Sequence, residues 1–279
     1  MASLGAALLA VGLLAACDSK VGIKGTDYDT GEPAPAPPSS SSSSAAPTPA
    51  AAPGELSVTV TLKTRDPEAA DALTRWAMDL QQLPTPALER RCWTMAPRNV
   101  ETMYADKQAI LAALTQPGID DGTAITWKSP ATATDGVTVV AERADIATGY
   151  ACPRVFPAGT EPGFDDADAR HTVRRYLARL SGSPLDPADK PGSYPLVCAA
   201  SPATWDPTGT GRPTAPPLAT EPDKLTGVQS FVDQSITSRS VRGDYIAVSV
   251  PVTTAAGRQD RTFTLRSGEQ GYCIGDVSA

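Results

Sequence analysis

The stretch SITSRSVRGDYIAVSVPVTTAAGRQDRTFTLRSGEQGYCIGDV, residues 235–277, decides the fold class of this chain. Short runs rich in β-branched and aromatic residues alternate there with glycine-containing turns, a pattern typical of antiparallel hairpins. We expect the turns at Arg242-Gly243-Asp244, Ala256-Gly257 and Ser267-Gly268. The predicted strands are 235–241, 244–253, 260–266 and 271–276.

An amphipathic helix is predicted ahead of this sheet at 168–180, DARHTVRRYLARL, where apolar residues recur every three to four positions. Asp165, Asp166 and Asp168 stand at its start, where carboxylates cap free amide groups and complement the helix dipole. A calcium site is the functional alternative for these acids, but a calcium loop needs spaced oxygen ligands and a glycine. Helix capping is therefore the interpretation that we favour.

The first half of the folded part shows the same order of elements as the second, which indicates an internal duplication. A predicted helix at 69–83 corresponds to the helix at 168–180. A cysteine in a helical segment follows each of them, Cys92 in LERRCWTM and Cys198 in YPLVCAAS. Further helices are expected at 100–114 and 225–234, and the first half then continues with strands at 123–128, 136–145 and 148–156. A strand predicted at 56–63 has no counterpart in the second half.

The N-terminal stretch has an apolar run at 4–14, about 11 residues long, which is the length of a signal-peptide core. A membrane-spanning helix needs about 20 apolar residues. The run ends in Leu14-Ala15-Ala16-Cys17, which resembles the lipobox of bacterial lipoproteins. The resemblance implies a lipid on Cys17, removal of the preceding residues, and anchoring to the outer face of the cytoplasmic membrane. The alternative is an ordinary secretory signal, and no Lys or Arg precedes the run.

The composition changes sharply after Cys17. Residues 33–53 contain proline, alanine, serine and threonine without any large apolar side chain, so this stretch cannot bury enough surface to offset its ordering entropy. We interpret it as part of a disordered linker. The predicted segments are 1–16, signal peptide; 17–54, lipidated Cys17 and linker; 55–160, first α+β domain; and 161–279, second α+β domain.

The remaining four of the five cysteines are Cys92, Cys152, Cys198 and Cys273. An even number in an oxidising compartment indicates two disulfides, for which three connectivities exist. In each half, one cysteine follows the leading helix and the other lies on the last strand. This repeated order favours Cys92 with Cys152 and Cys198 with Cys273.

The second half resembles nuclear transport factor 2-like domains, which occur in actinobacterial envelope proteins. The resemblance rests on the helix HTVRRYLARL, the CAAS segment after it and the strands of 235–277. It implies a curved antiparallel sheet wrapped around the helices, forming a cone whose interior can hold a ligand. Gln270-Gly271-Tyr272 departs from the Gly-Gly-Trp that often begins the final strand, and the first half matches less well. The expected fold class is α+β, with two similar helix-then-antiparallel-sheet units, one disulfide in each.

Charge and composition narrow the chemistry. The net charge is −7 and no basic stripe is present, which argues against a nucleic-acid partner. The single histidine, His171, lies in the first turn of a predicted helix, and we interpret it as solvated. A zinc site would need closely spaced Cys and His. We therefore predict no metal, no cofactor and no catalytic residue.

Three functional hypotheses remain after these exclusions. The leading one is a non-catalytic, membrane-anchored envelope lipoprotein that binds a protein or a cell-wall component. The alternative is a carrier of a small ligand or lipid in the cone pocket, and the third is an enzyme without a recognisable motif. A pocket of about 300 Å³ or more with convergent polar groups would favour the carrier. A filled core with an exposed apolar patch would favour the partner-binding protein.

Overall fold

The computed structural model describes residues 57–278. The predicted signal peptide, Cys17 and the linker at 17–54 lie outside this range, so the predictions about them remain predictions. The described residues belong to one compact unit. None of the helices within that range combines the length and the apolar composition needed to span a membrane.

The fold is a mixed α+β fold with two antiparallel sheets and, in the described residues, seven helices. The helices are α1 (Pro67–Gln82), α2 (Thr85–Arg91), α3 (Pro97–Met103), α4 (Lys107–Leu114), α5 (Arg143–Ile146), α6 (Asp166–Leu180) and α7 (Pro217–Thr220), with short 3-10 turns η1 (Pro222–Lys224) and η2 (Asp233–Ser235). The strands are β1 (Ile119–Asp120), β2 (Ala124–Lys128), β3 (Val137–Glu142), β4 (Arg154–Pro157), β5 (Ser230–Phe231), β6 (Thr237–Arg242), β7 (Tyr245–Thr254), β8 (Gly257–Gly268) and β9 (Gly271–Ser278).

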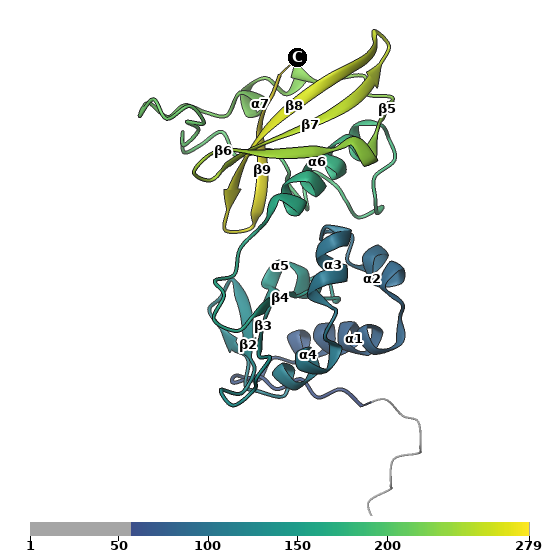
Figure 1. Cartoon of the computed structure of the whole chain (residues 1–279), viewed down its shortest axis with the longest axis vertical. Helices are drawn as coiled ribbons and strands as arrows, with labels where there is room; N and C mark the ends of the chain where they lie inside the picture. The colour runs from purple at the N-terminus through teal and green to yellow at the C-terminus, as the bar shows by residue number, and fades with distance from the viewer. Residues whose placement is uncertain (1–56, 279) are drawn as a thin grey trace, which may run out of the picture. The chain divides into compact units, whose positions relative to one another are not determined.

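The first sheet is a four-stranded antiparallel meander in the order β1-β2-β3-β4. Helices α1 to α4 precede it in the chain and pack beside it, as Figure 1 shows. Trp76 of α1 and Trp127 of β2 are fully buried in the core between helices and sheet. The indole of Trp127 also donates a hydrogen bond of 2.7 Å to the carbonyl of Thr61, which holds the preceding segment against the sheet.

Helix α1 confirms the amphipathic helix predicted at 69–83 and begins two residues earlier. The Asp66 carboxylate caps it by accepting a hydrogen bond of 3.0 Å from the amide of Ala69, and Pro67 occupies the first turn, where no amide donor is needed. Its buried face includes Leu73 and Leu80. Burial of that face in the first core, where α1 contacts α4 and α5, stabilises an element of this length more than helix propensity does.

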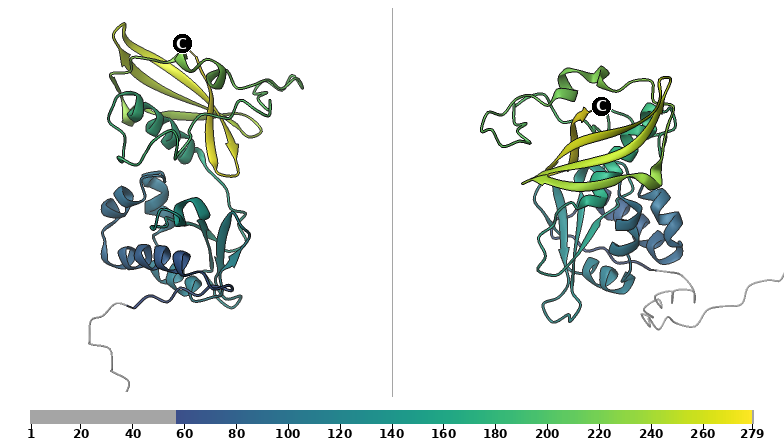
Figure 2. Two further views of the ribbon diagram at one scale, coloured as in Figure 1. Left: turned by 180° about the vertical axis from the view of Figure 1, so that it is seen from behind. Right: turned by 45° about the horizontal axis from the view of Figure 1, so that its top comes forward.

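The second sheet has five strands, with β7 at the centre of the pairing. Strands β5 and β6 pair with successive parts of β7, and β7, β8 and β9 form consecutive hairpins. The predicted turn at Arg242-Gly243-Asp244 connects β6 to β7, and Gly243 adopts a positive φ of 54° there. Helix α6 packs against this sheet, contacting β6, β7 and β9, and lies beside it in both views of Figure 2.

The two predicted disulfides are confirmed. Cys92 bonds to Cys152 over a separation of 60 residues, and Cys198 bonds to Cys273 over 75 residues. Each bridge lies within one half of the folded part and joins a segment that follows the leading helix to one at the end of that half. The inference from the repeated order of elements was therefore correct for the connectivity.

Three helix predictions were wrong in part or entirely. The helix at 100–114 is divided into α3 and α4, because the Asp106 carboxylate accepts a bond from Ala109 and starts a new helix. The helix at 225–234 does not form, since Gly227 has a φ of 64° and Gln229 instead bonds to the carbonyl of Thr253 beside β7. Cys198 lies in an extended segment, where its amide donates to the carbonyl of Ile274 on β9.

Three strand predictions also change. The strand at 136–145 ends at Glu142, and the single-turn helix α5 follows at once. The strand at 148–156 shortens to β4, because Gly149 has a φ of 81° and Pro153 has no amide to donate, so Cys152 precedes the strand. Within the described part of 56–63, Leu62 forms only an isolated bridge with Gly118.

Candidate functional site

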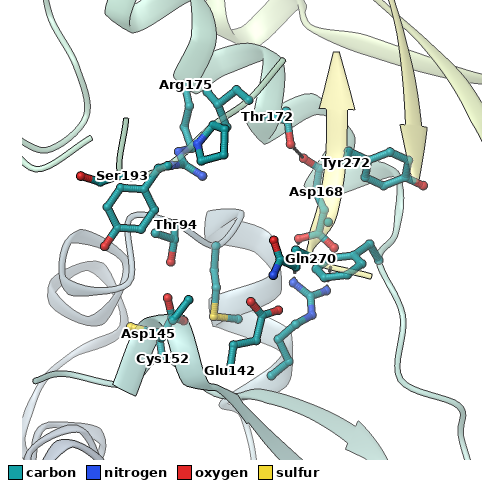
Figure 3. Close-up of a pocket in the computed structure, with 18 of the residues that line it drawn as sticks. Thr94, Glu142, Asp145, Cys152, Asp168, Thr172, Arg175, Ser193, Gln270 and Tyr272 are labelled. Carbon is teal, nitrogen blue, oxygen red and sulfur yellow. Dashed lines mark hydrogen bonds and ion pairs between the residues drawn. The ribbon is translucent and has the colours of Figure 1, made fainter. Parts of the chain in front are cut away.

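A cavity of about 380 Å³ is lined by residues from both halves of the folded part. One wall comes from the end of β3, from α5 and from the segment before β4. The opposite wall comes from α6, from residues 193–196 and from the turn between β8 and β9. In Figure 3, Glu142 and Asp145 extend from one side of this cavity, and Thr172 and Arg175 extend from the other.

Two carboxyl groups enter the cavity from the junction of β3 and α5. Glu142 is the last residue of β3 and the N-cap of α5, and Asp145 lies in the single turn of that helix. Within the described residues, neither side chain has a hydrogen-bond or ion-pair partner. Burial raises the pKa of Glu142, with Arg154 opposing the effect. Burial and the nearby negative charge of Glu142 raise the pKa of Asp145 to about 7, with Arg175 opposing them.

Arg154 lies on the wall next to these carboxyls, but its charge is neutralised. Its guanidinium forms two bonds to Asp168, Nη1–Oδ1 of 3.0 Å and Nη2–Oδ2 of 2.6 Å, and a third to the carbonyl of Gly163. Both ionic side chains are about nine-tenths buried. Phe164 stacks on the guanidinium at 4.5 Å. The Nε–H of Arg154 is buried without a partner among the described residues.

Arg175 is the second guanidinium of the cavity and is paired in the same way. It donates to the two carboxylate oxygens of Asp189, at 2.7 and 3.3 Å, and Arg179 contacts the same carboxylate. Burial opposes the charge of Asp189, but the two guanidinium groups outweigh burial and keep its pKa below the usual value. Trp93 packs on Arg175 at 4.9 Å. Asp189 is thus shared between Arg175 and Arg179, and the three side chains together keep one net positive charge.

The helix-capping prediction for the acids of α6 is confirmed, and one of them has a second role. Asp165 accepts bonds from the amides of Ala167 and Asp168 and forms a capping box with Asp168. Asp168 also forms the ion pair with Arg154, and both residues line the cavity. The amide of Asn99 bonds to both acids, at 3.1 and 2.9 Å. The capping residue thus also fixes a cation of the site.

The prediction for His171 was wrong. The side chain is not solvated: the residue is 5% exposed, and its Nε2 lies 2.8 Å from the carbonyl of Trp93. Burial lowers the pKa of His171 to about 4, so the imidazole is neutral at pH 7 and Nε2 is the donor in that bond. The reason for the error is tertiary: the segment that carries Trp93 covers the first turns of α6.

A second cavity, of about 540 Å³, adjoins the first. It is lined by the start of β2, by α5, by residues 162–164 and by Glu269 and Gln270 of the β8–β9 turn. Arg143 lines it as well, and this guanidinium bonds to both Asp66 and Asp120. The described cations of the second cavity are therefore paired, as in the first.

Few of the residues singled out in the sequence line this cavity. Cys152 lines the first cavity, whereas Cys92, Cys198 and Cys273 do not. Cys17 lies outside the described residues. Sequence reasoning missed Glu142, Asp145 and Arg154 altogether. The only local signal was the charged run Glu142-Arg143-Ala144-Asp145 directly after an apolar strand, where a solvated turn was the simpler expectation.

Within residues 57–278, no group of three or more His, Cys, Asp or Glu side chains is placed to hold a metal ion. Glu142 and Asp145, which have no partner in the described part of the chain, leave two carboxyl groups free to contact a ligand in the cavity. No protein-family model matches this chain, and no curated protein or solved structure matches it either. The function is therefore inferred from the geometry of the site.

Proposed function

We propose that this protein is a non-catalytic envelope lipoprotein, anchored through a lipid on Cys17, whose folded part binds a small cationic ligand in the cavity beside α5. The observation that supports the ligand is the pair Glu142 and Asp145, two carboxyls without partners among the described residues in a cavity of about 380 Å³. The lipobox-like Leu14-Ala15-Ala16-Cys17 supports the anchor. The proposal places the protein on the outer face of the cytoplasmic membrane.

A cation is favoured over other ligands because of the balance of charge in the cavity. Arg154 is neutralised by the buried Asp168, and Arg175 is held by Asp189, which it shares with Arg179, so both guanidinium groups are already engaged by carboxylates. Glu142 and Asp145 have raised pKa values because they are desolvated without a counter-ion. A ligand ammonium group would supply that counter-ion and lower both pKa values. A bound cation would therefore stabilise the ionised form of both carboxyls.

A small ligand is favoured over a protein partner for reasons of surface shape. The cavity has the size of a small-molecule site and brings polar groups together from several elements. Among the described residues, the exposed large apolar side chains lie on four different elements. They are Met78 on α1, Ile119 on β1, Leu180 on α6 and Val241 on β6. Scattered residues of this kind do not form the patch that a protein partner would need.

The resemblance to nuclear transport factor 2-like domains remains part of the proposal for the second half. The packing of α6 against β6, β7 and β9 supports it. The proposed ligand site differs from the one that the resemblance implied, because the cavity lies along the face of α6 that carries Asp168, Thr172 and Arg175, beside α5. The core between α6 and its sheet is filled by residues such as Val173, Leu177 and Phe263, each fully buried.

Three probes of equal length and different charge test the proposal: hexylammonium, hexanol and hexanoate. Each is titrated into the full-length protein in detergent by isothermal titration calorimetry. We expect the order hexylammonium, hexanol, hexanoate from tightest to weakest. Asp145→Asn and Glu142→Gln should each weaken hexylammonium severalfold. The matched controls Asp135→Asn and Glu161→Gln, both at exposed positions, should not.

Two results would contradict the proposal. Equal affinity for hexanol and hexylammonium would show that the carboxyls do not select charge. Unchanged hexylammonium affinity in Asp145→Asn would show that the cation binds elsewhere.

A further inference from the structure

The cavity of about 380 Å³ has charges of opposite sign on its two sides. Glu142 and Asp145 supply two carboxyl groups on the side of α5, and neither has a partner among the described residues. Figure 3 shows Arg175 extending into the cavity from the other side. Arg175 and Arg179 share the single carboxylate of Asp189, so this cluster keeps one net positive charge. A ligand in the cavity therefore meets negative charge on one wall and positive charge on the other.

The opposite charges influence one another without direct contact. The positive charge of Arg175 opposes the rise in the pKa of Asp145, and that of Arg154 opposes the rise in the pKa of Glu142. Within residues 57–278, however, no ion pair joins either carboxyl group to either guanidinium group. All four side chains line the same cavity, so a ligand there can contact groups of both signs.

A second observation indicates that the ligand carries a hydrogen-bond acceptor. Arg154 lines the cavity and is about nine-tenths buried, and its Nε–H has no hydrogen-bond partner in the described part of the chain. An unsatisfied buried donor costs free energy, and such groups in native proteins call for an explanation. An ammonium group has no acceptor, whereas a carboxylate is a strong acceptor for a guanidinium N–H. The ligand therefore needs an acceptor in addition to its cation.

We propose that the ligand of this cavity is a small zwitterion, with an ammonium group between Glu142 and Asp145 and a carboxylate group beside Arg154 and Arg175. Amino acids and short peptides with free ends belong to this class of compound. The inference rests on the proposed function, because it adds an anionic end to the same ligand. A simple amine compensates only one wall. A simple carboxylate meets the repulsion of the two carboxyls with no ammonium group to offset it.

Three matched pairs of probes test the proposal: glycine with ethylammonium, 4-aminobutanoate with butylammonium, and 6-aminohexanoate with hexylammonium. Within each pair the carbon chain and the ammonium group are the same, and the zwitterion has a carboxylate where the amine has a methyl group. Titration calorimetry with the full-length protein in detergent gives the Kd values at one fixed salt concentration, because salt screens such contacts. At least one zwitterion should bind about tenfold more tightly than its matched amine.

The spacer of the pair with the largest difference identifies the source of the zwitterion. A difference that is largest for glycine indicates an α-amino acid. A difference that is largest for a longer spacer indicates a peptide with free ends or an amino acid whose amine is on its side chain.

Variants separate the two ends of the ligand. Arg175→Gln should weaken the best zwitterion about tenfold and leave its matched amine unchanged, because only the zwitterion contacts this guanidinium. Asp189 keeps Arg179 as a partner in this variant. Binding of the amine also reports that the variant is folded. Asp145→Asn should weaken both members of each pair. Arg170→Gln is the matched control on the same helix and should change no Kd value, since Arg170 does not line this cavity.

The possible failures are distinguishable. If no probe binds, including hexylammonium, the proposed function itself fails. If the amines bind and require Asp145 but every zwitterion binds no more tightly than its amine, only the zwitterion is wrong. Equal weakening of a zwitterion and its amine by Arg175→Gln would also overturn the placement of the carboxylate.

Discussion

Arg154, the first residue of β4, and Asp168, in the first turn of α6, form a bidentate ion pair with bonds of 3.0 and 2.6 Å. The pair joins the first sheet to the leading helix of the second half and lies on the wall of the cavity. The Asn99 side-chain amide donates to the same carboxylate at 2.9 Å, and the backbone amide of Asp165 donates to it at 3.0 Å. The carboxylate of Asp168 is therefore held by Arg154, Asn99 and Asp165 together.

Removal of this pair should be costly. Arg154→Met leaves the buried carboxylate of Asp168 without its counter-ion, and we expect the free energy of unfolding to fall by about 3 kcal/mol or more. The matched control is Arg170→Met, because Arg170 pairs with the exposed Asp166 one helical turn away and should cost about 0.5 kcal/mol. Urea denaturation followed by tryptophan fluorescence measures both. Equal losses in the two variants would contradict the prediction.

Asp145 should make stability depend on pH. The folded protein keeps a proton on this carboxyl up to a pKa of about 7, whereas the unfolded chain releases it near pH 4. The free energy of unfolding therefore falls as the pH rises from about 4 to 7. Asp145→Asn should remove that fall and stabilise the protein at pH 7.5 by about 1 to 2 kcal/mol, a value reduced for partial exposure to solvent. Asp135→Asn should leave the profile unchanged.

His171 should act in the opposite sense over an overlapping range. Burial lowers its pKa to about 4 in the folded protein, whereas the unfolded chain takes up the proton near pH 6.5. Its contribution to stability is therefore complete above about pH 6.5 and is lost as the pH falls toward 4. Through His171, the free energy of unfolding of the wild type should decrease by roughly 2 to 3 kcal/mol across this window. His171→Gln should remove that decrease. An unchanged acid limb in urea titrations would show that the imidazole does not titrate there.

The two disulfides should stabilise their own halves. The bridges close loops with separations of 60 and 75 residues, which the chain-entropy model values at about 4 kcal/mol each. Cys273→Ser should therefore destabilise the second sheet, as measured by hydrogen exchange of β7 to β9, far more than β2 to β4. Cys152→Ser should produce the reverse pattern. Equal loss of protection in both sheets from either variant would contradict a local role for the bridges.

The lipid anchor is tested at a residue outside the described range. Cys17→Ser removes the thiol that receives the lipid, so we expect the variant to leave the membrane fraction or to accumulate as an uncut precursor. Fractionation with immunoblotting measures the distribution, and Ser19→Ala serves as the control. A variant that is processed and stays in the membrane fraction like the wild type would disprove the lipoprotein proposal.

Much of the second sheet could be predicted because its information is local. Alternating β-branched residues between glycine turns place β6 to β9 within a few residues of the expected strands. The same holds for α1 and α6, which have strong apolar periodicity and aspartate caps. The failures occurred where the pattern was weak. The segment 225–234 has some helical periodicity, but pairing with β7 satisfies its backbone instead.

The sequence by itself determined the α+β class, the main helices and strands and, through the repeated order of elements, the disulfide connectivity. Only the tertiary structure decided which charges are satisfied. Arg154 and Asp168 are 14 residues apart, as are Arg175 and Asp189, and nothing in their local patterns indicates that they pair in a buried wall. Tertiary packing also leaves Glu142 and Asp145 without partners among residues 57–278, and it buries His171. Desolvation and charge pairing depend on which distant segments meet, and they are properties of the packed chain rather than of local sequence.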